Sequence, residues 1–285
     1  MTVKNHQFYD YTNSSEMEIN RLHTQAEILH NFEQPVFDRI ISTIEKPIIL
    51  DIGCNDGTAS MKRLRDFDIC SYTGIDISET AIENAEEKYG NENINFYCSD
   101  ITDNNFSVFL SKILNNGKAD IIIISLVLLH LEKPCELLKN LKSFLKPGGR
   151  IIIKDIDDRN NKTTYDPDGI FEFAYSITNR TPFSGNRHTG KNIINWLSEC
   201  GYSDIKNEAD GLSTIGMTIY ERQALYETYF GFFLEDCEAS VKNNSYDKAE
   251  NDLLWCKENL PKIKQLIENE DFVFSLGFTI VSATV

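Results

Sequence analysis

The stretch IILDIGCNDGTAS at residues 48–60 places an acid and two glycines at the exit of an apolar run. Asp51 closes the apolar run, and Gly53 and Gly57 follow it. After the first strand of an open α/β sheet, a glycine-rich turn lets the backbone approach a ligand beside a helix N-terminus. We therefore expect a ligand site in the crevice at the carboxyl end of this strand.

Two classes of ligand compete for such a turn. A nicotinamide dinucleotide requires G-x-G-x-x-G, but the residues from Gly53 read G-C-N-D-G-T, so the second and third glycines of that fingerprint are missing. Asp51 would also lie unfavourably close to a diphosphate. The turn therefore favours a ligand that carries a cationic group.

The elements around this turn alternate between apolar runs and amphipathic segments. Strands are expected at 47–53, 70–77, 94–100, 119–130 and 148–156, and helices at 58–65, 79–89, 105–114 and 134–145. The sequence LKPGG at 145–149 predicts a helix stop and a turn. Apolar runs without alternation are typical of parallel strands buried on both faces. The pattern predicts a doubly wound α/β sheet.

The flanking segments are expected to be mainly helical. Residues 14–44 have helical spacing, with Pro35 opening a second helix, and an irregular insert is expected over 158–186. A helix ending at Gly201 and a strand come next. Residues 221–238 and 247–268 are expected to be helical, the latter interrupted at Pro261, before a closing strand at 272–285.

With these elements in place, the sequence resembles the class I S-adenosylmethionine (SAM)-dependent methyltransferases, of the bacterial small-molecule type. Their first motif, acid-x-Gly-x-Gly-x-Gly, is matched at Asp51, Gly53 and Gly57 and departs at Asn55. The resemblance covers residues 46–156 and includes acids at the next two strand ends, ADIIIISLVLLHLEKP as the fourth motif, and LKPGGRIII after it. Asn tolerates the left-handed conformation that the loop needs at Asn55.

The resemblance implies a doubly wound, Rossmann-like, seven-stranded, mostly parallel sheet, with N-terminal lid helices and a helical insertion before the last strand. Residues 1–45 would form the helical lid and residues 46–156 the SAM-binding core. Residues 157–285 would supply the substrate-covering insert, helices and closing strands of the same domain.

The resemblance also implies how SAM is held and released as S-adenosylhomocysteine. Asp51 would face the amino-acid end, Asp76 the ribose hydroxyls, Asp100 the adenine amino group, and Ile101 the ring. An E-x-x-RL-x-x-Q pattern at 18–25 resembles a lid helix whose arginine, here Arg21, meets the methionine carboxylate. The full set of expected cofactor contacts is Asp51, Gly53, Cys54, Asn55, Gly57, Asp76, Ile77, Asp100, Ile101, Ser125, Arg21 and Tyr11.

Methyl transfer from a sulfonium is an in-line displacement that depends mostly on positioning and exclusion of water. A general base helps when the nucleophile is a hydroxyl or a protonated amine. His130 and Asp155, at the ends of the fourth and fifth strands, are the catalytic candidates, although a packing role for His130 stays open. The expected substrate-binding residues are Tyr175, His188 and Tyr220.

The composition narrows the classes of partner. The net charge is −16 and no Lys/Arg cluster is present, so no nucleic-acid partner is expected. Seven scattered cysteines show neither a metal-ligand spacing nor a complete disulfide pattern, so no metal is expected. The apolar run 121–131 is far shorter than a membrane span, and the N-terminus does not resemble a signal peptide, so we expect a cytoplasmic protein without membrane contact.

The leading hypothesis is therefore a SAM-dependent transfer of a methyl group to O or N of a small metabolite in a lidded pocket. Two alternatives remain: a methyltransferase acting on RNA or protein, and a catalytically inactive SAM-binding regulatory protein. Oligomeric state is left open, with a homodimer as one option.

Overall fold

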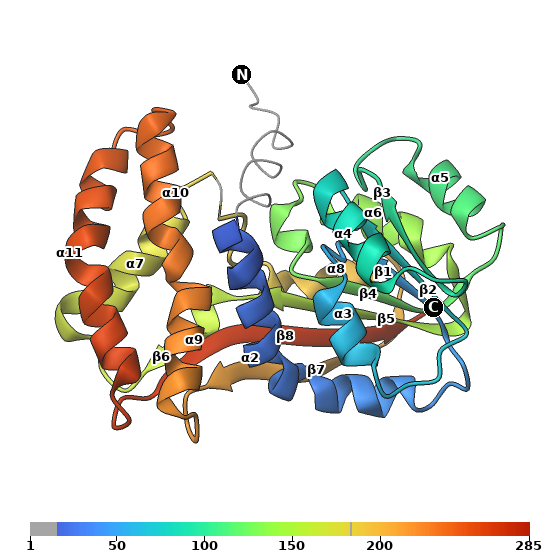
Figure 1. The fold of residues 1–285 in the computed structure, drawn as a ribbon, viewed down its shortest axis with the longest axis horizontal. Coiled ribbons are helices and arrows are strands. Elements are labelled where there is room, and N and C mark those ends of the chain that lie inside the picture. Colours follow the sequence, from blue (N-terminus) through green and yellow to red (C-terminus); the bar gives the residue numbers. More distant parts are fainter. Residues whose placement is uncertain (1–15, 183) are drawn as a thin grey trace.

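A single mixed β-sheet organises the chain, of which the computed structural model describes residues 16–182 and 184–285 (Figure 1). Its strand order is β3-β2-β1-β4-β5-β8-β6, and β7 also pairs with β8. Seven strands were expected and eight are found, because the two-residue strand β6 extends the edge. The strands are β1 (Ile48–Ile52), β2 (Ser71–Asp76), β3 (Ile94–Cys98), β4 (Ala119–Ser125), β5 (Leu145–Ile156), β6 (Lys162–Thr163), β7 (Ser203–Ser213) and β8 (Phe274–Thr284).

Strands β1 to β5 are parallel, and β8 runs antiparallel to β5, β6 and β7. The isoleucines of β4, from Ile121 to Ile124, are at most 1% exposed, because both faces of the sheet are covered. The carboxyl ends of these five neighbouring parallel strands therefore meet at one edge of the sheet.

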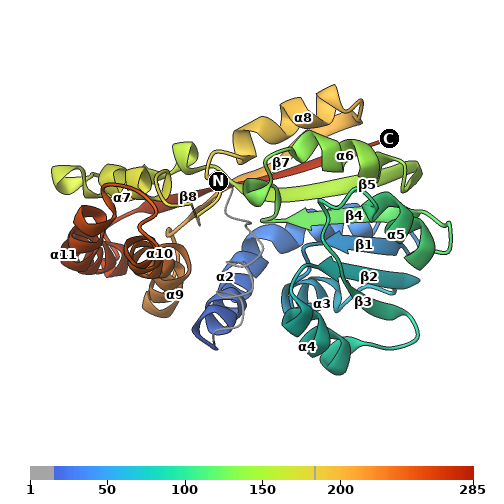
Figure 2. The ribbon, with the colours of Figure 1, turned by 90° about the horizontal axis from the view of Figure 1, so that it is seen from above.

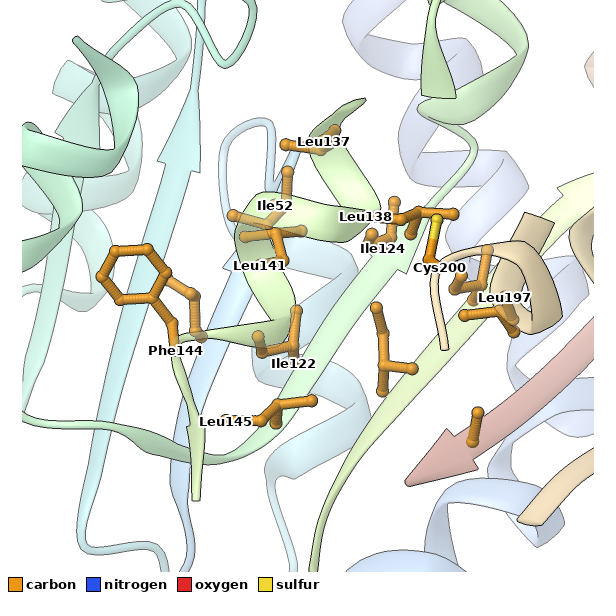
Figure 3. Packing of buried hydrophobic residues seen from close by; sticks show 14 of the residues in the cluster. Ile52, Ile122, Ile124, Leu137, Leu138, Leu141, Phe144, Leu145, Leu197 and Cys200 are labelled. Carbon is orange, nitrogen blue, oxygen red and sulfur yellow. The ribbon is translucent and has the colours of Figure 1, made fainter. Parts of the chain in front are cut away.

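Helices cover both faces of the sheet, as the view from above shows (Figure 2). On one face α5 (Phe106–Ile113), α6 (Pro134–Lys142) and α8 (Ile193–Glu199) pack on alternate residues of β4 such as Ile122 and Ile124. Figure 3 shows the side chains of α6 and α8 that lie around these two isoleucines. The other face carries α3 (Thr58–Leu64), α4 (Glu79–Tyr89) and the second half of α2 (Glu16–Ile41). This is the doubly wound arrangement that the alternating pattern predicts.

A second, helical layer extends beyond the sheet edge and contains α7 (Ile170–Thr178), α9 (Ile219–Tyr229), α10 (Gly231–Lys242) and α11 (Ala249–Glu268) (Figure 1). Its core is aromatic, with Phe171 stacked on Phe272 and Phe274 at ring-centroid distances of 5.5 and 5.8 Å. The aromatic side chains of these segments therefore mostly form a hydrophobic core.

Several expected boundaries were wrong for identifiable reasons. Pro35 and Pro261 do not open or interrupt helices but lie inside α2 and α11. Each proline removes one helical hydrogen bond, but buried side chains on both sides of it hold the helix together, for example Glu33 and Phe37 around Pro35. The expected irregular insert contains α7, whose buried residues Ile170, Phe171, Ala174 and Ile177 have helical spacing.

The expected turn at 145–149 lies inside β5, where the pairing register with β4 shifts and Gly148 has φ 76°. Strand β4 ends at Ser125, earlier than expected, and His130 ends a short 3-10 helix, η1 (Leu128–His130). In residues 16–182 and 184–285, no helix combines the length and apolarity needed to cross a bilayer.

Candidate functional site

A cavity of about 710 Å³ opens at the carboxyl ends of β1, β2, β3 and β4. Its walls come from the glycine loop, the strand ends and one face of α2. Of the expected cofactor contacts it is lined by Asp51, Gly53, Cys54, Asn55, Asp76, Ile77, Asp100, Ile101 and Ser125. From α2 it receives Leu22, His23, Gln25, Ala26, Leu29 and Glu33.

Asp51 lies at the floor of this cavity and is 1% exposed. Its Oδ2 accepts hydrogen bonds from the Ser60 hydroxyl and, at 2.9 Å, from the Tyr72 hydroxyl. Its Oδ1 has no hydrogen-bond partner within the described part of the chain. Burial raises the pKa of Asp51, and the positive charge of Arg63 opposes that shift. A cationic ligand group at Oδ1 would stabilise the ionised form.

The glycine loop needs backbone conformations that few residues adopt. Gly53 and Gly57 have φ 77° and 73°, and a Cβ on Gly53 would lie 2.2 Å from Cγ2 of Val127. Asn55, where the family motif has glycine, has φ 50°. The expectation that Asn55 keeps the left-handed bend is confirmed. Gly57 packs against Phe96. Within the described part of the chain, the cavity lining does not include Gly57.

Asp76 ties the loop to the end of β2. Its Oδ2 accepts a hydrogen bond from the Asn55 amide at 2.8 Å, and its Oδ1 one from the Ser78 amide at 3.0 Å. Burial raises the pKa of Asp76, and these amides oppose the shift. At the end of β3, Oδ1 of Asp100 accepts hydrogen bonds from the amide and hydroxyl of Thr102, at 2.8 and 2.7 Å. Each carboxylate keeps acceptor capacity for ligand hydroxyl or amino groups.

Three buried charges beneath the cavity were not expected from the sequence. Glu33 of α2, which is 2% exposed, accepts hydrogen bonds from Nε and Nη2 of Arg63 at 3.1 and 2.8 Å and from Nζ of Lys154. All three side chains line the cavity. Nη1 of Arg63 has no hydrogen-bond partner in the described chain. For Lys154 the sequence does carry a signal, because a charged residue inside an apolar run such as IIIKDI indicates a buried charge.

Arg21 is not placed where the resemblance implied. Its guanidinium donates two 2.7 Å hydrogen bonds to Glu18 and one of 3.2 Å to the Thr228 carbonyl, and it lies over the Phe232 ring. Within residues 16–182 and 184–285, the cavity lining does not include Arg21. The position of Arg21 around the helix explains why it points away from the cavity, because the face of α2 that lines the cavity carries residues 22, 25, 26, 29 and 33. Tyr11 lies outside the described residues.

His130 lies at the rim of the cavity, but Asp155 does not reach it. Burial, together with the charges of Arg187 and Arg21, lowers the pKa of His130 to about 4, so the imidazole is neutral at pH 7. Asp155 is fully buried and accepts hydrogen bonds from the amides of Ile156 and Leu129, at 2.8 and 3.2 Å. Asp155 therefore holds the η1 turn in place, and we do not retain the role of orienting a substrate.

The three expected substrate contacts are dispersed. Tyr220 is 79% exposed at the start of α9. His188 is half-buried, and its carbonyl accepts a hydrogen bond from Arg159. The Tyr175 hydroxyl is buried without a partner in the described chain. Within that part of the chain, none of the three lines the cavity.

SAM fits the groups that this cavity presents. A positively charged amine matches the open oxygen of Asp51, a carboxylate matches the open nitrogen of Arg63, and the buried hydroxyl of Ser125 also has no partner in the described chain. Sugar hydroxyls and a purine match the acids at the ends of β2 and β3.

Comparisons with known proteins agree with this fit. Residues 50–151 match the family model described as "Methyltransferase domain". The chain is 26% identical over 209 residues to a malonyl-[acyl-carrier protein] O-methyltransferase of Halalkalibacterium halodurans, covering 73% of this chain and 70% of the relative. It is 29% identical over 167 residues to a tRNA U34 carboxymethyltransferase of Nautilia profundicola, covering 57% of this chain but only half of that relative.

Among solved structures, the fold is similar to phosphoethanolamine N-methyltransferase 2 of Haemonchus contortus in complex with S-adenosyl-L-methionine. The TM-score is 0.58 at 16% identity, covering 99% of this chain and 60% of that one, so the likeness concerns the fold. The matched domain coincides with the sheet and strand ends that build the cavity. The motif, the cavity and the match over residues 50–151 together show a methyltransferase domain of the class I S-adenosylmethionine-dependent type in this chain.

Proposed function

We propose that the chain transfers a methyl group from SAM to an oxygen or nitrogen of a small acceptor in a pocket closed by α2. The observation that carries the proposal is the cover over the cavity. Four residues from the first half of α2, Leu22, His23, Gln25 and Ala26, line it, and that half is fastened across the glycine loop. Nε2 of His23 lies 2.7 Å from Oδ2 of Asp56, and Lys62 pairs with Glu27. A covered cavity favours a small acceptor over a folded macromolecule.

Four side chains are proposed to hold the cofactor. Asp51 would accept from its ammonium, Arg63 would donate to its carboxylate, Asp76 would accept from the ribose hydroxyls, and Asp100 from the adenine amino group. Assigning the carboxylate to Arg63 replaces the expectation for Arg21. When bound, SAM supplies an electrophilic methyl group on a sulfonium.

The remaining contribution of the chain is positioning and exclusion of water. Val127 and Leu126 follow β4 and line the cavity beside Gly53, so the reacting atoms would meet an apolar wall. His130, neutral at pH 7, is proposed to orient an acceptor by a hydrogen bond. With its pKa lowered to about 4, His130 is a weak base at neutral pH. A general base works best when its pKa lies near the working pH, so His130 is poorly suited to that role.

Relatives support different acceptors. The H. halodurans relative is named for O-methylation of a carrier-bound malonyl group, whereas the N. profundicola relative is named for tRNA. With a net charge of −16, this chain lacks the phosphate-neutralising charge that nucleic-acid binding requires, which favours the small acceptor.

A labelled-methyl screen tests the proposal. The protein is incubated with methyl-labelled SAM and a cell extract, and label is counted separately in small-molecule, protein and RNA fractions. We expect label in the small-molecule fraction with the wild type and none with Asp76→Ala. Label confined to protein or RNA would refute the small-molecule proposal, and SAM binding without label in any fraction would favour a regulatory role.

A further inference from the structure

The first turns of α2 form one wall of the cavity, and they are only partly packed into the protein. Leu22 and Gln25 line the cavity, yet none of residues 18–25 is fully buried. Beyond this segment Ala26 and Leu29 are 8% and 1% exposed, so the rest of the helix begins to join the core there. Segments with few buried contacts open most readily in a folded protein. The part of α2 that can open is therefore the part that covers the cavity.

The opposite wall is the glycine loop, which a series of hydrogen bonds fixes to the sheet. The Asp56 amide donates to Oδ1 of Asn55 at 2.6 Å, and the Asn55 amide donates to Oδ2 of Asp76 at 2.8 Å. The Asp56 carboxylate also accepts from the amide and the hydroxyl of Thr58, at 3.0 and 3.1 Å, which ties the loop to the start of α3. The loop is therefore the fixed wall, and the first turns of α2 are the wall that can move.

His23 joins the two walls. Its Nε2 lies 2.7 Å from Oδ2 of Asp56, and both residues line the cavity. An ionised carboxylate only accepts hydrogen bonds, so Nε2 of His23 carries the shared proton. One turn along α2, Glu27 pairs with Lys62 of α3, but this carboxylate is 67% exposed, against 20% for Asp56, and water screens it more strongly. The contact between His23 and Asp56 is therefore the main closure between α2 and the glycine loop.

We propose that the contact between His23 and Asp56 is a latch that gates the exchange of SAM and S-adenosylhomocysteine, which pass between the first turns of α2 and the glycine loop. This rests on the proposed function, in which α2 closes the SAM pocket. The latch joins two protein groups to each other, so it slows entry and release alike. Weakening it raises the fraction of open molecules with and without cofactor, and both rate constants rise together. Their ratio, the dissociation constant, stays nearly constant. Loss of a side chain that contacts SAM would instead raise the release rate alone.

The test measures association and dissociation rates of SAM by surface plasmon resonance on the immobilised protein. His23→Gln is compared with His30→Gln, a matched loss of one imidazole on the same helix. His30 is half-buried and, within the described chain, is not part of the cavity lining. Circular dichroism first establishes that each variant is folded. We expect both rates to rise about three- to tenfold in His23→Gln, with a dissociation constant within about twofold of wild type, because one partly exposed hydrogen bond is lost. His30→Gln should keep the wild-type rates.

A double-mutant cycle with Asp56→Asn, which keeps an oxygen acceptor for Thr58, identifies the contact itself. Asp56→Asn should raise both rates as His23→Gln does, and the double variant should exceed neither single variant, because all three remove the same contact.

Three results would overturn the latch. Wild-type rates in His23→Gln would place the way out at the other end of the cavity, which residues 102–104 and 132–133 line. A rise in the dissociation rate alone would make His23 a contact of SAM. Additive effects of the two substitutions would show that they do not act through one contact. A wild-type protein that does not bind SAM would instead refute the proposed function.

Discussion

Glu33 offers a direct test of the buried charges beneath the cavity. It is the shared counter-ion of Arg63 and Lys154, which are 1% and 5% exposed. Glu33→Gln keeps the size of the side chain but removes the counter-ion that two buried cations share, while Asp51 remains nearby. Removing one partner of a buried ion pair typically costs about 3–5 kcal/mol, because the other partner stays buried and uncompensated. We expect the free energy of unfolding to fall by about that amount.

The pH dependence of the loss has a definite sign. Burial alone would raise the pKa of Glu33, but the charges of Arg63 and Lys154 outweigh it and lower the pKa. A carboxyl whose folded-state pKa is lowered contributes stability that is present above its unfolded pKa of about 4.3 and lost as the pH falls through the folded value. The difference between wild type and Glu33→Gln should therefore be largest at neutral pH and shrink below about pH 4.

Urea unfolding followed by circular dichroism measures this difference, with Glu27→Gln as the matched control on the same helix. Glu27 pairs with Lys62 but is 67% exposed, so its loss should cost less than about 1 kcal/mol. Equal midpoints for Glu33→Gln and wild type at pH 7, or an equal effect of the two substitutions, would refute the reasoning.

Three further outcomes are expected. Gly53→Ala should lower stability and SAM affinity more than Gly148→Ala, as measured by the urea midpoint and by calorimetry. Both glycines have φ above 70°, but an added Cβ would lie 2.2 Å from Val127 Cγ2 at Gly53 and would meet no atom within 4 Å at Gly148. Equal effects of the two substitutions would count against this. Arg222→Met should cost roughly 3 kcal/mol in urea unfolding, since its buried guanidinium donates to the carbonyls of Thr214, Ile267, Asn269, Glu270 and Phe272; a wild-type midpoint would contradict this. Burial raises the pKa of Asp155 to about 7, so its contribution to stability is present below about pH 4 and lost as the pH rises through 7; Asp155→Asn should remove that decline, and an unchanged stability–pH curve would show the carboxyl to be already ionised.

The central sheet could be predicted from local pattern. The isoleucine runs of β4 and β5 have no polar alternation, which indicates strands buried on both faces. The acids at the ends of β1, β2 and β3 line the cavity at the same edge of the sheet. The bend of the glycine loop could also be predicted, because Asn is one of the few residue types besides glycine that adopt the left-handed conformation, and Asn55 has φ 50°.

What the sequence could not show depends on contacts between distant segments. Helix α2 continues through Pro35 because other elements hold the buried side chains of Glu33 and Phe37. Local helix propensity contains no information about such contacts. The contacts of Arg21 are decided by its position on α2 and by α9, whose Thr228 carbonyl accepts a hydrogen bond from it. Charged side chains are mostly exposed in proteins, and no local pattern indicates that Arg63 is buried.

Calorimetric titration of the wild type and Asp51→Asn with SAM, S-adenosylhomocysteine and NAD tests the central claim most directly. The account predicts that the wild type binds both sulfur compounds at one site and does not bind NAD. In Asp51→Asn, loss of the charged acceptor at Oδ1 should weaken SAM binding about 10- to 100-fold, equivalent to about 1.5–3 kcal/mol. Binding of NAD in place of SAM, or an unchanged SAM affinity in Asp51→Asn, would contradict it.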